Sequence, residues 1–118
     1  GRTDVLIMIL PSGEATQHAL NAERLAQLPD HAYVVNVGRG STVDEAALVD
    51  ALARGAIAGA ALDVTETEPL PADSPVWDPP NLVLTPHAAG GRAAGADELI
   101  EHNVRALLDG RDLRNQVR

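Results

Sequence analysis

Hydrophobic positions in this 118-residue chain form short apolar runs that alternate with stretches of helical spacing. Residues 4–10 (DVLIMIL) are continuously apolar after the first, which is typical of a strand buried on both faces. Similar runs predict further strands at 33–37, 57–64 and 81–85. Each run ends in glycine, proline or a polar turn, so the four strands are separate elements.

Helical spacing fills three of the intervals. The sequence predicts a helix over 21–28 with Asn21 as its N-cap, and a second from Asp44 as N-cap to Arg54, closed by Gly55. A last helix is predicted over 92–109. We expect its buried stripe to comprise Ala96, Leu99, Ile100, Val104, Leu107 and Leu108.

The order of these elements indicates an α/β fold, with a parallel sheet and helical crossovers. Four strands in this order amount to about half of a doubly wound domain, whose apolar edge would be exposed if it stood alone. We therefore expect the chain to be part of a longer protein.

Composition narrows the class of protein. Hydrophobic residues make up 45% and charged residues 22%, which is ordinary for a globular domain. The net charge of −8 repels phosphate backbones, so nucleic acid is not expected as a partner. No apolar run is long enough for a membrane span, and the absence of cysteine excludes disulfides and thiolate chemistry.

Chemically capable side chains follow the predicted strands. Arg39, between two glycines, comes after the second strand, Asp63 and Glu68 after the third, and His87 after the fourth. Each alone is more often structural, but the carboxyl ends of parallel strands meet at one edge of the sheet. Together they predict an acid/base site with an arginine that binds an anion.

Other motifs add no chemistry. His18, His31 and His102 have no metal-ligand spacing, so we expect them to face solvent and expect no metal. The segment 38–42 (GRGST) lacks the lysine and the glycine spacing of a P-loop.

The segments 34–64, 66–71 (ETEPLP) and 81–91 (NLVLTPHAAGG) closely resemble the D-isomer-specific 2-hydroxyacid dehydrogenases. The resemblance covers nearly the whole chain and implies the second half of a Rossmann-like dinucleotide-binding domain, within the C-terminal portion of the enzyme. It divides the chain into a sheet half over about 4–90 and a helix over about 92–109 that packs back toward a substrate domain.

The resemblance also implies roles for individual residues. Arg39 binds the substrate carboxylate and carbonyl, His87 paired with Glu68 donates and accepts the proton, and Asp63 binds the nicotinamide carboxamide. The cofactor-binding positions that it implies are Leu10, Pro11, Thr16, Val37, Gly38, Arg39, Asp63, His87, Ala89 and Gly90.

The expected function is hydride transfer between NAD or NADP and a small 2-oxo or 2-hydroxy acid. This describes a glyoxylate/hydroxypyruvate reductase or a phosphoglycerate dehydrogenase-like enzyme. Formate-oxidising members of the family carry Gln at the Glu68 position, so Glu68 favours a keto-acid reductase. The family implies a cytoplasmic homodimer. The alternatives are an NAD(H)-sensing module of the corepressor type and a structural piece that is inactive alone.

Overall fold

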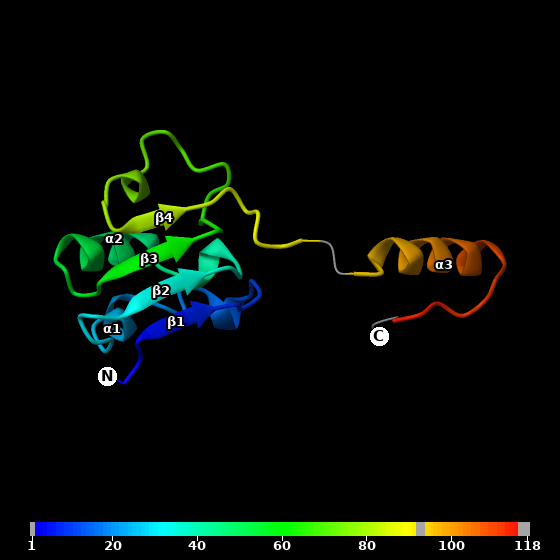
Figure 1. The fold of residues 1–118 in the computed structure, drawn as a ribbon, viewed down its shortest axis with the longest axis horizontal. Coiled ribbons are helices and arrows are strands. Elements are labelled where there is room, and N and C mark those ends of the chain that lie inside the picture. Colours follow the sequence, from blue (N-terminus) through cyan, green and yellow to red (C-terminus); the bar gives the residue numbers. More distant parts are fainter. Residues whose placement is uncertain (1, 92–93, 116–118) are drawn as a thin grey trace.

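The computed structural model describes residues 2–91 and 94–115 of the chain. Its centre is a parallel four-stranded sheet in which the strands lie side by side in chain order (Figure 1). They are β1 (Val5–Met8), β2 (Tyr33–Asn36), β3 (Gly59–Leu62) and β4 (Leu82–Leu84). The four predicted strands and their parallel order are thus confirmed, although each strand is shorter than its apolar run.

The register places all four carboxyl ends at one edge. Met8 is opposite Asn36, Asn36 is opposite Leu62, and Leu62 is opposite Leu84. The loops that follow these residues therefore start from a common line, which is where parallel α/β sheets bind ligands.

Two short helices, α1 (Ala22–Leu25) and α2 (Glu45–Ala53), connect the first three strands. Both predicted N-caps are confirmed: the Asn21 side chain accepts from a backbone N–H of α1, and Asp44 does the same at α2. α1 ends at Leu25, earlier than predicted, because the chain then tightens into turns in which the N–H groups of Gln27 and Leu28 donate to the carbonyls three residues back.

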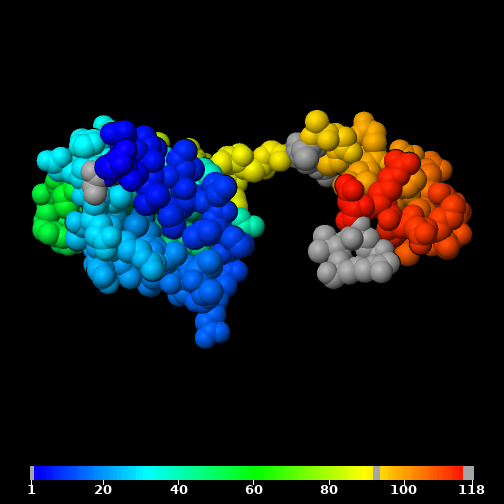
Figure 2. Space-filling model, turned by 90° about the horizontal axis from the view of Figure 1, so that it is seen from below, coloured from blue at the N-terminus to red at the C-terminus, as the bar shows by residue number. Residues whose placement is uncertain are grey.

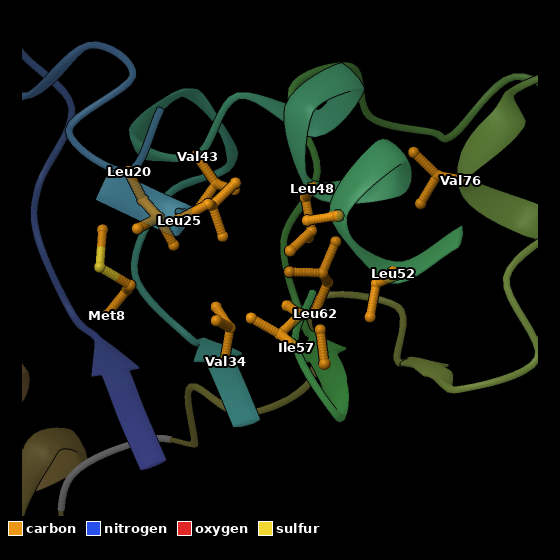
Figure 3. Close-up of a cluster of buried hydrophobic side chains, with 12 residues drawn as sticks. Met8, Leu20, Leu25, Val34, Val43, Leu48, Leu52, Ile57, Leu62 and Val76 are labelled. Carbon is orange, nitrogen blue, oxygen red and sulfur yellow. The ribbon is translucent and has the colours of Figure 1, made fainter. Parts of the chain in front are cut away.

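One face of the sheet and these two helices enclose the core (Figure 3). Leu48 and Ile57 are each 1% exposed, and Val34 is fully buried. The other labelled members of this cluster are Met8, Leu20, Leu25, Val43, Leu52, Leu62 and Val76.

The opposite face of the sheet is open among the described residues. Side chains alternate between the faces along a strand, and here Val5, Ile7 and Val83 are 52%, 60% and 62% exposed. The expectation that residues 4–10 are buried on both faces is therefore wrong for this structure, because a helical layer covers only one of them.

α3 (Ala96–Leu108) stands apart from the sheet, beyond the carboxyl ends of the strands (Figures 1 and 2). Arg92, where the sequence predicts its start, lies outside the described residues. The expected buried stripe is wrong here, since Ile100 and Val104 are each 53% exposed and Leu108 is 81% exposed. Within the described residues, no helix combines the length and apolar character needed to cross a membrane.

Candidate active site

The predicted site residues converge at the carboxyl edge of the sheet. A cleft of about 190 Å³ brings Arg39, Glu68 and His87 together, as the strand order predicts. Ser12, Gly40, Ser41, Thr65 and Glu66 complete its lining. An arginine, a carboxylate and an imidazole thus share the wall of one small cavity.

Arg39 sits on a turn fixed by buried polar side chains. Asn36, fully buried at the end of β2, donates from Nδ2 to the Arg39 carbonyl at 3.1 Å and accepts the Gly38 N–H at 3.1 Å. The fully buried Thr42 hydroxyl donates to the same Arg39 carbonyl at 2.7 Å. These bonds satisfy the buried polar atoms and hold the backbone of Arg39 in one conformation.

The glycines beside Arg39 are required by close packing. A Cβ on Gly40 would lie 1.9 Å from the Thr65 carbonyl oxygen, and one on Gly38 would lie 2.7 Å from that of Leu10. The turn is therefore wedged between the loops that follow β1 and β3. The Arg39 side chain is exposed, with Nη1 donating to the Gly38 carbonyl at 2.7 Å.

His87 and Glu68 form a direct pair. His87 Nδ1 lies 2.8 Å from Glu68 Oε2, and the other carboxylate oxygen accepts the Thr65 N–H at 3.1 Å. The bond from His87, followed by that from Thr65, lowers the pKa of Glu68 below its usual value. Both side chains remain partly exposed, so the pair is open to a ligand.

Asp63, at the end of β3, is turned toward the His87 loop. Its carboxylate accepts from the Thr85 hydroxyl and from the N–H groups of Ala88 and Ala89, the latter two at 2.8 Å each. The Thr85 bond, then the Ala89 bond, lower the pKa of Asp63. The predicted binding of a nicotinamide carboxamide by Asp63 remains a prediction.

The loop that carries Glu68 is anchored to the start of α2. Glu45 and Glu66 each accept the other's backbone N–H, at 2.6 and 3.0 Å. Burial is the main cause that raises the pKa of Glu45. The His18 side chain is only partly exposed, and its buried Nε2 lies 3.3 Å from Glu66 Oε1, so the expectation that His18 is an ordinary solvent-facing residue is wrong. The His18 N–H donates to the Ser41 carbonyl at 2.8 Å, which holds the loop after β1 near this anchor.

The other predicted cofactor positions lie along the same edge. Leu10 and Pro11 follow β1 and are exposed, and the Thr16 hydroxyl closes their loop by donating to the Pro11 carbonyl at 2.7 Å. Val37, which is 39% exposed, and Gly90, with open space where a Cβ would be, complete the row.

A larger cleft of about 640 Å³ also borders the pair. Asp63, Glu68 and His87 contribute to it, beside the apolar side chains of Leu70 and Trp77. Sequence reasoning assigned no role to this apolar wall, nor to Asn36 and Thr42. A buried asparagine at the end of an apolar strand is the signal that could have identified Asn36.

A parallel sheet that gathers an imidazole–carboxylate pair and an arginine at its carboxyl edge has the arrangement in which α/β domains bind ligands. Residues 1–89 match the model of the family described as D-isomer specific 2-hydroxyacid dehydrogenase, NAD binding domain. The chain belongs to this family.

Curated relatives match almost all of the chain. An uncharacterised protein of Corynebacterium melassecola is 46% identical over 117 residues, and glyoxylate/hydroxypyruvate reductase A of Salmonella paratyphi B is 45% identical over 117 residues. The alignments cover 97% and 98% of this chain. The chain spans 38% of the length of each relative.

Solved structures match the fold. A D-isomer specific 2-hydroxyacid dehydrogenase from Xanthobacter autotrophicus, in complex with NADPH and MES, is 45% identical with a TM-score of 0.83. The match covers 98% of this chain and 48% of that one. An NADPH-dependent glyoxylate/hydroxypyruvate reductase from Sinorhizobium meliloti, in complex with NADP and sulfate, is 36% identical with a TM-score of 0.84, covering 99% and 39%.

Proposed function

We propose that the intact protein is an NAD(P)-dependent 2-hydroxyacid dehydrogenase that interconverts a small 2-oxo acid and its 2-hydroxy acid. A glyoxylate/hydroxypyruvate reductase is the favoured activity, and a phosphoglycerate dehydrogenase-like activity is the second. The observation that carries this proposal is the His87–Glu68 pair facing the same small cleft as Arg39. The names of the relatives support the substrate class.

His87 is proposed to exchange the proton with the substrate's C2 oxygen. Imidazole is suited to this because it titrates near neutral pH. Nδ1 is engaged by Glu68 at 2.8 Å, so Nε2 is the ring nitrogen assigned to the substrate. Glu68 thereby fixes the orientation and tautomer of the ring, while Arg39 binds the carboxylate through its planar fork of donors. A cleft of about 190 Å³ suits a small acid.

The cofactor is proposed to be NAD or NADP, which when bound supplies or takes up the hydride at C2. Val37, Gly38, Ala89 and Gly90 would line the nicotinamide, with Asp63 near its carboxamide. Leu10, Pro11 and Thr16 would line the ribose side. The packing of Gly38 supports this assignment. Its backbone lies against that of Leu10, and glycine adds no side chain at the edge where the nicotinamide is proposed to lie.

We propose that residues 4–90 form one half of a dinucleotide-binding domain, and that α3 packs toward a substrate domain. Two apolar surfaces that are exposed within the part of the chain that the structure describes support this arrangement: the open sheet face, which includes Val5, Ile7 and Val83, and the stripe on α3. From the family alone, we also propose a cytoplasmic homodimer, which sedimentation of the full-length protein and cell fractionation would test.

The direct test is oxidation of NADH or NADPH by the full-length protein with glyoxylate, hydroxypyruvate or pyruvate. We expect turnover with at least one pair, and none by the 118-residue chain alone. Cofactor binding without turnover of any acid would instead support the sensor alternative.

Arg39→Lys tests the anion-binding role. Lysine keeps the charge but cannot reproduce the paired hydrogen bonds, so we expect KM for the acid to rise about tenfold or more and kcat to fall. The dissociation constant of the cofactor should stay nearly unchanged. Equal loss of cofactor and acid binding would contradict this role.

A further inference from the structure

Asp63 has a structural relation to His87 that a cofactor contact does not explain. Its side chain is almost completely buried, with 6% exposure, at the end of β3. The carboxylate accepts three donors, all from the loop around His87: the Thr85 hydroxyl and the N–H groups of Ala88 and Ala89. The Asp63 carbonyl accepts the His87 N–H itself at 2.8 Å. One residue thus holds the backbone on both sides of the histidine.

The backbone of His87 needs such support. Its φ of 53° lies in the left-handed region, which is uncommon for a residue with a Cβ. Such a conformation persists only where surrounding contacts fix it, and the Asp63 bonds are contacts of this kind. If they are lost, the backbone is free to relax toward ordinary φ values, and the imidazole moves with it.

We propose that Asp63 is a positioning residue for His87: its carboxylate holds residues 85–89 in the left-handed turn that presents the imidazole to Glu68. The assignment of His87 as the proton-exchanging group rests on the proposed function. The hydrogen bonds from Thr85 and Ala89 also lower the pKa of Asp63, so the carboxylate is ionised at neutral pH. Charged acceptors form the stronger bonds, which suits this task.

The test compares Asp63→Asn with Asp44→Asn in the full-length protein. Asp44 is a matched control because its carboxylate also accepts a backbone N–H, that of Ala47 at 3.0 Å, but at the start of α2. Imidazole ¹⁵N chemical shifts report the tautomer of His87 and its bond to Glu68. We expect Asp63→Asn to change these shifts and Asp44→Asn to leave them as in the unmodified protein.

The kinetic readout separates positioning from cofactor binding. A small misplacement of a catalytic group can cost about 100-fold in rate, so we expect kcat of Asp63→Asn to fall about 10- to 100-fold. This kcat is measured at saturating cofactor, so a rise in the cofactor dissociation constant of Asp63→Asn, whose carboxylate is also proposed to lie near the carboxamide, does not enter the comparison. Weakened cofactor binding with unchanged His87 shifts and kcat would overturn the proposal in favour of a carboxamide contact alone.

Thr85→Val keeps the proposal testable if Asp63→Asn does not fold. It removes one donor to the carboxylate with almost no change in shape, so the His87 shifts should change in the same direction by a smaller amount. Unchanged shifts in this variant would count against the proposal. If the unmodified protein transfers no hydride, the proposed function fails, whereas the NMR comparison still decides the positioning role.

Discussion

The two turns that form the site are held in different ways. The Arg39 turn, residues 36–42, is fixed by neutral groups: the buried side chains of Asn36 and Thr42, and glycines with no room for a Cβ. The His87 turn, residues 85–89, is exposed and is fixed by two carboxylates, those of Asp63 and Glu68.

This difference matches the tasks proposed for the two turns. A residue that binds a carboxylate needs constant geometry, which neutral hydrogen bonds and steric fit provide at any pH. A residue that exchanges protons gains from charged neighbours, which orient the imidazole but are themselves sensitive to acid. The geometry of the Arg39 turn should therefore be sensitive to added side-chain volume, and that of the His87 turn to the charge of the carboxylates that hold it.

The largest effect is expected from His87→Ala in the full-length protein. Loss of a general acid costs about 10²- to 10⁴-fold in rate, so kcat/KM for reduction should fall in that range while the cofactor still binds. His31→Ala is the control, because His31 is exposed beside Asp4, at the start of the strands. It should change kcat/KM less than about twofold, well under 1 kcal/mol. A fall in kcat/KM of less than about tenfold in His87→Ala would contradict the proposed proton exchange by His87.

Gly40→Ala should affect the Arg39 turn through volume alone. A Cβ 1.9 Å from the Thr65 carbonyl forces the backbone apart, and overpacking of this kind costs about 1–3 kcal/mol. Denaturant unfolding measures the change, with Gly91→Ala as the control, since nothing lies within 4 Å of that position. Equal stability of the two variants would show that the turn is not wedged as described.

A smaller effect should separate the turns by pH. The pKa of Asp63 is lowered on folding, so its bonds are complete above the ordinary carboxyl range and are lost as the pH falls through the lowered pKa. As the pH falls from neutral to below the ordinary carboxyl range, we expect the Ala88 and Ala89 amides to lose protection from hydrogen exchange after correction for intrinsic rates. The Gly38 amide, bonded to the neutral Asn36, should keep its protection relative to them. An equal loss of protection at the Ala88, Ala89 and Gly38 amides would contradict the proposed difference between the two turns.

Much of this site follows from the sequence because it depends on local patterns. Apolar runs and turn residues predict the four strands, and parallel order then places Arg39, Glu68 and His87 at one edge. The helix caps at Asn21 and Asp44 are local in the same sense.

The remainder depends on contacts between distant segments. The left-handed backbone of His87 and its support by Asp63 join residues 22–26 positions apart, with no sequence pattern to mark them. The open sheet face and the exposed α3 stripe depend on what packs against them, which an apolar pattern cannot specify. His18 lies beside Glu66 only because the loop after β1 and the loop after β3 approach each other.

We propose that Glu68 acts through His87, as one unit distinct from the Arg39 turn. A double-mutant cycle of Glu68→Gln and His87→Ala on kcat/KM tests this most directly. Glu68→Gln alone should lower kcat/KM about tenfold, the equivalent of about 1.4 kcal/mol, and should have almost no further effect in the His87→Ala background. Full multiplication of the two losses would contradict the account, because it would show that Glu68 serves the reaction independently of His87.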